Sequence, residues 1–192
     1  RENALQHPNW SMGAKITVDS ATLMNKGLEF IEAMHLYRMP PEKISVLIHR
    51  ESIIHSLVEY CDNAMIAQLG APDMRLPIQY ALTWPERTEG PASPLDLLAC
   101  PPLTFYQPDL EAFPCLALAL DCAKRGGTST AVLNGANEAA VALFLAGKIG
   151  FLDIPHLVER ALGQVETSEN PNLEDILWAD QAARRAVQFN LR

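Results

Sequence analysis

Seven of the 14 prolines in the chain lie within residues 85–114, which read PERTEGPASPLDLLACPPLTFYQPDLEAFP. Neither a continuous helix nor a central strand tolerates prolines at this density, because proline fixes φ and removes a backbone N–H donor. We therefore expect a proline-rich linker over residues 85–112. It would separate a central segment, residues 1–84, from a C-terminal segment, residues 113–192.

The C-terminal segment has the start and stop signals of four helices. Pro114 suits the first turn of a helix that two glycines end, and an Ala- and Leu-rich helix follows over residues 130–146. Asp153 and Asn172 are N-cap residue types that begin two more. Helices of this length joined by short loops favour an antiparallel bundle.

The last of these helices carries four apolar side chains at helical spacing. We expect this face to pack in the core of the bundle. The four residues are Trp178, Ala182, Ala186 and Phe189.

The central segment mixes strand and helix signals. Residues 15–18 and 44–48 are short apolar runs with β-branched side chains, which are typical of buried strands. Between them, the sequence DSAT at residues 19–22 is a start signal for a helix over about residues 21–37.

Two further elements precede the linker. Residues 54–69 are predicted to form a β-hairpin whose arms meet at Asp62-Asn63, residue types that accept positive φ. A helix is expected from near Asp73 to just before Pro85. Together these signals predict an α/β central domain with a small mixed sheet, followed by the linker and an all-α helical bundle.

The chain is acidic, with 15 Lys and Arg against 23 Asp and Glu and a formal net charge of −8. Such a chain repels phosphate backbones, so we expect no nucleic-acid partner. We also expect no membrane partner, because no apolar run reaches the roughly 18 residues that a membrane helix needs. The four cysteines form no Cys-x-x-Cys pair and are predicted to be free thiols in the cytoplasm, with a plastid stroma as the alternative.

A narrow polar stripe runs along the helix expected over residues 21–37. Its members, Thr22, Asn25, Lys26 and Glu29, are spaced so that they stack on one helix face. One interpretation is a solvated face with a Lys26–Glu29 ion pair worth about a few tenths of a kcal/mol. The other interpretation is a binding site.

The residue types in and before the stripe suit a phosphorylated sugar. Ser20 is expected at the helix N-terminus, where free N–H groups and the helix dipole favour an anion. Asn25 and Lys26 are donors of the kind that phosphate and polyol sites use. Glu29, one turn further, could ligate a hard cation such as Mg²⁺ or Mn²⁺. A sugar-phosphate site is therefore the functional interpretation.

An unusual segment, HPNWSMG, precedes the stripe at residues 7–13. It joins a titratable imidazole, His7, to two large apolar side chains, Trp10 and Met12, and ends at Gly13. As a lid, Trp10 would cover a bound substrate and exclude water. The alternative is a strand whose Trp10 packs on the core.

Several runs closely resemble the 1-deoxy-D-xylulose 5-phosphate reductoisomerases, and the resemblance covers nearly the whole chain. Its longest part, across residues 7–29, is far more specific than any short motif. The runs are HPNWSMG at 7–13, KITVDSATLMNKGLE at 15–29, SIIHSLVEY at 52–60, AQLG at 67–70, PDMR at 72–75, LTF at 103–105, FPCL at 113–116 and NE at 137–138.

The resemblance implies an enzyme of non-mevalonate isoprenoid biosynthesis. Members of the family rearrange the carbon skeleton of 1-deoxy-D-xylulose 5-phosphate and reduce the product with NADPH to 2-C-methyl-D-erythritol 4-phosphate. A divalent metal, Mg²⁺ or Mn²⁺, polarises the oxygens of the ketose. The resemblance also implies a homodimer, which the hairpin at residues 54–69 could form through its sheet edge.

The resemblance assigns roles by position. Ser20, Asn25 and Lys26 would hold the substrate, with Ser20 toward its phosphate. Glu29 would bind both the substrate and the metal. Lys26 and Glu29 are thus the expected catalytic residues, and His55 is either a proton donor or a hydrogen-bonded structural histidine.

The resemblance also assigns the lid and the cofactor side. His7 would contact the phosphate end of the substrate, and Trp10 and Met12 would cover the reacting carbons. Gly13 would approach NADPH with its backbone, and Met74 would lie toward the nicotinamide.

The chain departs from the family pattern in three ways. It has no glycine-rich dinucleotide loop and no Asp-Ser-Glu motif to supply further metal-binding acids, and Arg50-Glu51 follows His49 where the family has Pro-Gln. We therefore expect the isolated chain not to turn over substrate. Two rival hypotheses are a non-catalytic dimerisation or scaffold module derived from this fold, and a metal-dependent sugar-phosphate isomerase without redox chemistry.

Overall fold

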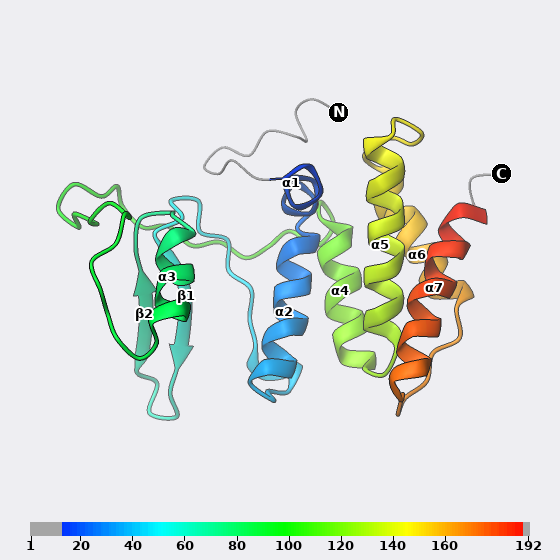
Figure 1. The fold of residues 1–192 in the computed structure, drawn as a ribbon, viewed down its shortest axis with the longest axis horizontal. Coiled ribbons are helices and arrows are strands. Elements are labelled where there is room, and N and C mark those ends of the chain that lie inside the picture. The colour runs from blue at the N-terminus through cyan, green and yellow to red at the C-terminus, as the bar shows by residue number, and fades with distance from the viewer. Residues whose placement is uncertain (1–12, 190–192) are drawn as a thin grey trace. The chain divides into compact units, whose positions relative to one another are not determined.

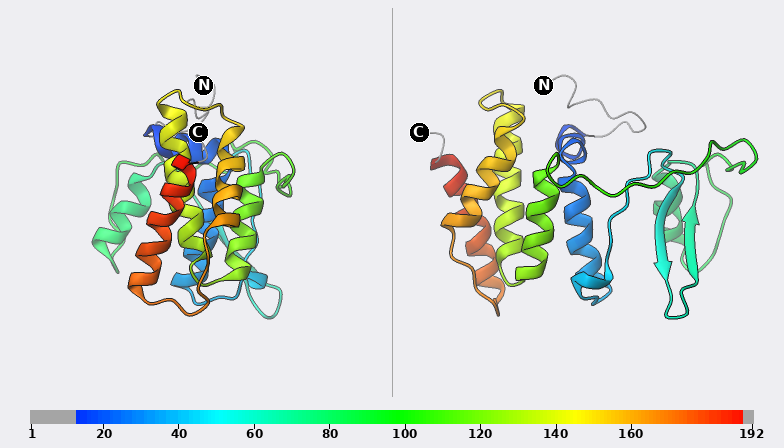
Figure 2. Two further views of the ribbon diagram at one scale, coloured as in Figure 1. Left: turned by 90° about the vertical axis from the view of Figure 1, so that its right-hand side faces the viewer. Right: turned by 180° about the vertical axis from the view of Figure 1, so that it is seen from behind.

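The computed structural model describes residues 13–189, which group into two compact units. The first unit takes residues from both sides of the proline-rich stretch, 13–46 and 108–189, and the second is residues 47–107. Figures 1 and 2 show the helices of the first unit and the hairpin of the second. The expected domains at residues 1–84, 85–112 and 113–192 stay a prediction, because compactness does not show which parts fold alone.

Within the described residues of the first unit, the regular secondary structure is helical. Two helices that precede the linker pack beside the four predicted after it, so the bundle is confirmed and is larger than expected. α2 lies beside α4, α4 beside α5, and α5 beside α7 (Figure 1). Within residues 13–189, none of the helices is both long and apolar enough to span a membrane. The elements of this unit are α1 (Ala14–Ala21), α2 (Met24–Leu36), a 3-10 turn (Pro41–Lys43), α4 (Pro114–Arg125), α5 (Ser129–Leu145), α6 (Asp153–Gln164) and α7 (Leu173–Phe189).

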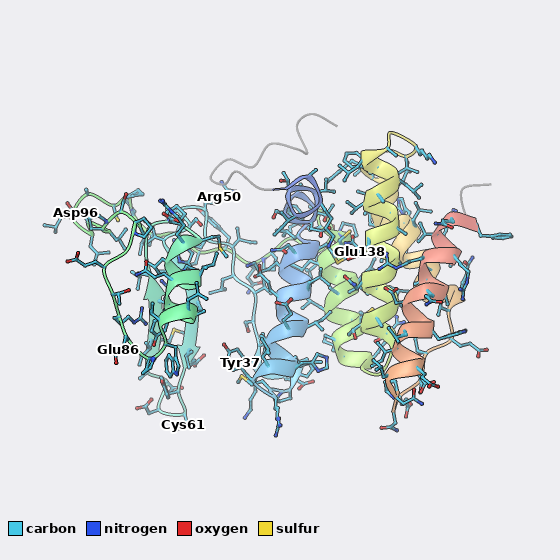
Figure 3. The ribbon with its side chains drawn as sticks, viewed as in Figure 1. Tyr37, Arg50, Cys61, Glu86, Asp96 and Glu138 are labelled. Atoms are coloured by element: carbon cyan, nitrogen blue, oxygen red, sulfur yellow. The ribbon has the colours of Figure 1, made fainter. Side chains whose placement is uncertain are left out.

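Small and medium apolar side chains build the core of the first unit. Leu116 and Leu133 are fully buried. Cys115 and Cys122 are free thiols in the same core, and burial raises the pKa of Cys115 to about 12. These two cysteines therefore act as the small hydrophobic residues that the sequence predicted. Cys61, by contrast, is exposed at the tip of the hairpin (Figure 3).

Residues 15–18 lie in helix α1, so the strand predicted there is wrong. The Lys15 ammonium pairs with Asp19 one turn later at 2.8 Å, a contact that only a helix makes at this spacing. Val18 and Asp19 are buried against the rest of the unit. Tertiary burial thus outweighs the strand preference of the β-branched residues.

α1 and α2 meet at a tight corner, so the single helix expected over residues 21–37 is two helices. Leu23 lies between them in the left-handed region, with φ of 56°. The hydroxyl oxygen of Thr22 accepts the N–H of Met24 at 3.3 Å and so satisfies one of the free N–H groups at the start of α2. Because a non-glycine residue with positive φ is uncommon, the DSAT signal does not reveal this corner.

The apolar face that the sequence predicted for the core side of α7 is largely exposed. Trp178 and Phe189 are 53% and 73% exposed, whereas Ala179 is fully buried. α5 and α7 approach closely, because a Cβ on Gly135 of α5 would lie only 2.7 Å from the backbone oxygen of Asp180. Only small side chains fit at such a contact, so alanines face the core and the indole lies outside.

The second unit holds the small sheet. β1 (Ile54–Glu59) pairs antiparallel with β2 (Met65–Leu69), and α3 (Arg75–Thr83) follows. Asn63 in the connecting turn has φ of 67°, as the predicted hairpin requires. The expected fold class, an α/β segment with a small sheet before a helical bundle, is confirmed, with two antiparallel strands in place of a mixed sheet.

Residues 44–48 do not form the buried strand that the sequence predicted. In the second unit Ile48 makes an isolated bridge with Tyr106. In the first unit Ile44 and Val46 pack against the helical core. This short apolar run is thus divided between the two units, and a continuous apolar pattern does not indicate such a division.

A polar clip, made of His49, Glu51 and Thr104, joins the two ends of the second unit. His49 Nδ1 lies 2.9 Å from Glu51 Oε2, and the Thr104 hydroxyl donates to Glu51 Oε1 at 2.6 Å. Phe105 stacks on the His49 ring, with 4.9 Å between ring centroids. The hydrogen bond from the Thr104 side chain is the main reason that the pKa of Glu51 is lowered.

Glu51→Gln should destabilise the protein at neutral pH but not in acid. Because the pKa of Glu51 is lowered on folding, its carboxylate stabilises the fold above its unfolded pKa of about 4.5, and this contribution is lost as pH falls through the folded pKa. We expect chemical denaturation to show a full deficit in the free energy of unfolding near neutral pH and none in acid. Glu59→Gln, on exposed β1, is the control, and a deficit for Glu51→Gln that is independent of pH would contradict the prediction.

Candidate functional site

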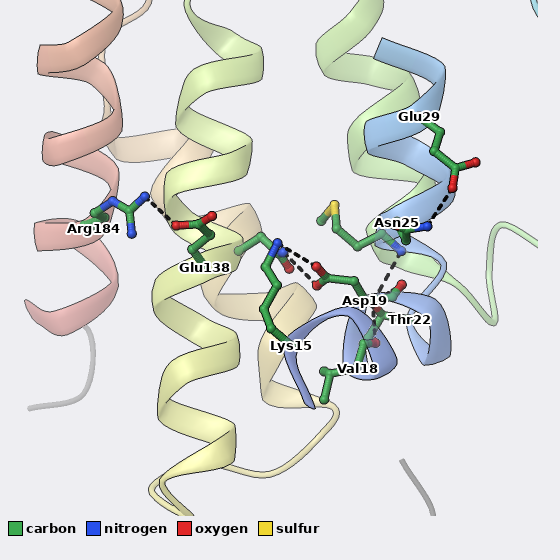
Figure 4. Close-up of polar contacts among 10 residues, drawn as sticks. Lys15, Val18, Asp19, Thr22, Asn25, Glu29, Glu138 and Arg184 are labelled. Carbon is green, nitrogen blue, oxygen red and sulfur yellow. Dashed lines mark hydrogen bonds and ion pairs between the residues drawn. The ribbon is translucent and has the colours of Figure 1, made fainter. Parts of the chain in front are cut away.

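Three of the predicted site residues come together on an exposed face of α2. Asn25 Nδ2 donates to Glu29 Oε1 at 2.7 Å, and the Lys26 ammonium forms an ion pair with the other oxygen, Oε2 (Figure 4 shows the Asn25 contact). The side chains of Lys26 and Glu29 are each 44% exposed. An amide, an ammonium and a carboxylate therefore lie in reach of solvent within two helical turns.

Thr22 does not belong to this cluster, although the spacing placed it on the same face. It precedes the corner and is only 6% exposed. Its hydroxyl donates to the carbonyl oxygen of Val18 at 3.2 Å, inside the fold. The predicted stripe is therefore shorter than expected and consists of Asn25, Lys26 and Glu29.

Ser20 lies in the last turn of α1, so its predicted place at the start of a helix is wrong. It is half-buried and stands ahead of the corner that leads into α2. The N-cap position of α2 is Leu23, which makes no side-chain capping bond. The first-turn N–H groups of Asn25 and Lys26 have no acceptor within their own helix, which is the arrangement that anions bind.

The predicted lid is only partly described. His7, Trp10 and Met12 lie outside the described residues. Gly13 is exposed, and its carbonyl oxygen accepts the hydroxyl of Thr17 at 2.9 Å. A Cβ on Gly13 would meet nothing within 4 Å in the described part of the chain, so packing there does not require glycine.

His55 and Met74 belong to the second unit. His55 Nδ1 lies 3.2 Å from Gln68 Oε1, and Nε2 lies 3.0 Å from the carbonyl oxygen of Ser52. Both ring nitrogens thus have partners on an exposed hairpin. Met74 is 58% exposed and precedes α3. Their expected roles as proton donor and as neighbour of the nicotinamide stay predictions.

The described residues do not complete a metal or dinucleotide site. Within residues 13–189, no group of three or more His, Cys, Asp and Glu side chains is arranged to hold a metal ion. Glu29 would supply one carboxylate, whereas a hard divalent cation takes about six oxygen ligands. Gly13 and Met74 are likewise too few to hold a dinucleotide.

Sequence reasoning missed one polar contact beside the site. Asn137 Nδ2, on α5, donates to Asp19 Oδ1, on α1, at 2.9 Å. The two residues are 118 positions apart, and nothing in either local pattern pairs them. The i,i+4 spacing of Lys15 and Asp19 would indicate a charged partner for Asp19 only if residues 15–19 were expected to be helical.

By fold and sequence together, the chain corresponds to the C-terminal part of the reductoisomerases. Residues 69–186 match the family described as DXP reductoisomerase C-terminal domain. Residues 1–37 match the family described as 1-deoxy-D-xylulose 5-phosphate reductoisomerase C-terminal domain. The chain belongs to this reductoisomerase family, and the resemblance seen in its sequence is confirmed.

Two curated relatives illustrate the similarity. The 1-deoxy-D-xylulose 5-phosphate reductoisomerase of Acetivibrio thermocellus is 57% identical over 185 residues, which cover 96% of this chain and 49% of that protein. That of Chlorobium chlorochromatii is 61% identical over 183 residues, covering 95% and 48%. The chain thus spans about half the length of the curated relatives it matches.

Two solved structures share the fold. The reductoisomerase from Zymomonas mobilis in complex with NADPH aligns with a TM-score of 0.89 at 48% identity, over 100% of this chain and 49% of that one. A DOX-P reductoisomerase in complex with NADPH, fosmidomycin and magnesium aligns with a TM-score of 0.91 at 46% identity, over 99% of this chain and 49% of that one.

Proposed function

We propose that this chain forms the substrate-binding and C-terminal part of an NADPH- and divalent-metal-dependent enzyme that converts 1-deoxy-D-xylulose 5-phosphate to 2-C-methyl-D-erythritol 4-phosphate, in non-mevalonate isoprenoid biosynthesis. The observation that carries the proposal is the exposed cluster of Asn25, Lys26 and Glu29 on α2. It lies in a chain whose relatives are reductoisomerases, one of them solved with NADPH, fosmidomycin and magnesium.

The cluster would work by exchanging partners. In the structure the Lys26 ammonium and the Asn25 amide both contact the carboxylate of Glu29. Because Lys26 and Glu29 are each 44% exposed, water screens their ion pair and opening it costs little free energy. Lys26 and Asn25 would then donate to the substrate, with Ser20 and the first N–H groups of α2 toward its phosphate. Glu29 would contribute one oxygen ligand to Mg²⁺ or Mn²⁺.

The remaining predicted residues complete the proposal. His7 would contact the phosphate end of the substrate, and Trp10 and Met12 would cover the reacting carbons and exclude water. Gly13 and Met74 would lie toward NADPH. His55 would act as a proton donor once it releases one of its present partners, Gln68 or Ser52.

We also propose a homodimer in the cytoplasm, formed through the hairpin. Val58, Met65 and Ile66 of β1 and β2 are more than half exposed, and exposed apolar groups on a sheet edge favour pairing with a second copy. Sedimentation would test it, since Met65→Lys combined with Ile66→Lys should shift a dimer to a monomer.

The experiment for the activity uses a full-length chimera, defined as this chain joined to the N-terminal half of the Acetivibrio thermocellus relative. We expect it to oxidise NADPH when 1-deoxy-D-xylulose 5-phosphate and Mn²⁺ are supplied. Isomerisation without NADPH oxidation would favour a redox-free isomerase. A folded chimera that neither binds nor converts the substrate would favour the scaffold module.

Lys26→Ala in the chimera should weaken substrate binding more than turnover. The variant removes a charged donor to the substrate, so we expect the KM for the sugar phosphate to rise about tenfold while the KM for NADPH stays within about twofold. Steady-state kinetics measures both constants. Lys43→Ala, a lysine in the exposed 3-10 turn, is the matched control. An unchanged substrate KM in Lys26→Ala would remove this residue from the site.

A further inference from the structure

Asp19 is a buried carboxylate that directly precedes Ser20. Its side chain is 2% exposed and lies between two partners. The Lys15 ammonium, one turn earlier on α1, is 2.8 Å from Asp19 Oδ2 (Figure 4). The Asn137 amide of α5 donates to Asp19 Oδ1 at 2.9 Å. One carboxylate thus ties the short helix α1 to the central helix of the bundle.

Asn137 is an unusual side chain for its place. It is fully buried on α5, and its Oδ1 has no hydrogen-bond partner within the described part of the chain. A buried acceptor without a partner costs free energy, and a leucine of similar size would remove that cost but leave the buried carboxylate of Asp19 without its amide donor. The contact with Asp19 is therefore what accounts for an amide here. What the amide adds is a directional hydrogen bond to Asp19.

The hydrogen bond, together with the burial of Val18, sets how α1 is rotated about its own axis. Successive side chains on a helix point about 100° apart, so holding Asp19 inward fixes the direction of Ser20. Ser20 is half-buried, whereas Asp19 is buried. The left-handed residue Leu23 then leads directly from α1 into the first turn of α2. The rotation of α1 therefore determines where Ser20 stands before the start of α2.

We propose that Asp19 and Asn137 form a positioning pair for the phosphate-binding end of the substrate site. Both side chains are buried, so neither touches the substrate. They act through Ser20 and through the first-turn N–H groups of α2, whose places they fix against α5. This inference rests on the proposed function and adds to it a specific dependence of phosphate affinity on a residue 118 positions away from Asp19.

The test uses Asn137→Leu in the full-length chimera, with inorganic phosphate as a probe of the phosphate subsite. We expect the KM for the sugar phosphate and the inhibition constant of inorganic phosphate to rise together by about tenfold, with kcat and the KM for NADPH within about twofold of the parent. A merely structural role would lower the active fraction, and hence kcat, without changing either of the first two constants.

Two further variants make the result decisive. Asp19→Asn combined with Asn137→Leu leaves no unpaired buried charge. If the single variant does not fold, we expect this double variant to show the same rise in both constants. Arg184→Gln breaks the 2.7 Å ion pair to Glu138, the neighbour of Asn137 on α5, and should leave both constants unchanged. If the unsubstituted chimera is active and these variants keep its KM and inhibition constant, the positioning role of Asp19 and Asn137 is wrong, whereas the proposed function stands. An inactive parent would overturn the proposed function and this inference with it.

Discussion

Glu29→Gln in the full-length chimera is expected to lower kcat/KM about a thousandfold. Glutamine keeps the shape of the side chain and can still accept the hydrogen bond from Asn25. It removes the negative charge that both Lys26 and a divalent cation require. The variant therefore separates the charge of Glu29 from its packing.

Metal binding gives a readout independent of turnover. We expect the dissociation constant for Mn²⁺, measured by electron paramagnetic resonance in the presence of fosmidomycin, to rise by at least about tenfold in Glu29→Gln. Lys26→Ala should leave this constant much less affected, because it acts on the substrate. Glu29→Gln would thus mainly weaken metal binding, whereas Lys26→Ala would mainly weaken substrate binding.

Glu32→Gln is the matched control for Glu29→Gln. Glu32 is an exposed acid on the same helix, less than one turn further on. If both variants reduce activity by the same small factor, the cluster is only a solvated helix face with an ion pair worth about a few tenths of a kcal/mol. That result would favour the scaffold interpretation over the enzyme.

The parts of the fold that the sequence predicted well are those set by local signals. Pro114 does begin α4, and Asn172 does cap α7, since its side-chain oxygen accepts the N–H of Asp175 at 3.0 Å. Asn63 turns the hairpin with positive φ, as its residue type allows. Each of these features depends on contacts within a few residues, which a single sequence displays.

The parts that failed depend on contacts between distant segments. α1 is a helix because Val18 and Asp19 are buried against the bundle, which its β-branched residues do not reveal. Trp178 faces outward because α7 approaches α5 too closely for an indole, and that distance is a property of the packed pair.

In the candidate site, too, the sequence predicted local contacts correctly and missed the contacts between distant segments. The i,i+3 and i,i+4 spacings within one helix brought Asn25, Lys26 and Glu29 together correctly. Thr22 was misplaced because the corner at Leu23 interrupts the helix on which its spacing was counted. The buried contact of Asp19 with Asn137 was not predictable, because it joins two segments that only the packed bundle brings together.

Gly27 connects the site to the fold, and Gly27→Ala should destabilise the protein by about 2 kcal/mol. The residue is buried on α2, next to Lys26, where α2 packs on α4. A Cβ at this position would collide with the Cβ of Ala119 on α4. Neither methyl group can rotate away, because both are fixed to helical backbones. Accommodating the alanine therefore requires α2 and α4 to separate, which exposes apolar surface and displaces the cluster.

Gly163→Ala makes the same chemical change but should alter the stability of the protein in the opposite direction. Gly163 is exposed on α6, and an added Cβ would meet nothing within 4 Å of it in the described residues. Alanine is favoured over glycine within a helix, so this variant should stabilise the protein by up to about 0.5–1 kcal/mol. Urea denaturation of the two variants beside the parent measures both changes. If Gly27→Ala were as stable as Gly163→Ala, α2 would not pack closely on α4. The placement of Asn25, Lys26 and Glu29 would then have to be set by contacts other than this one.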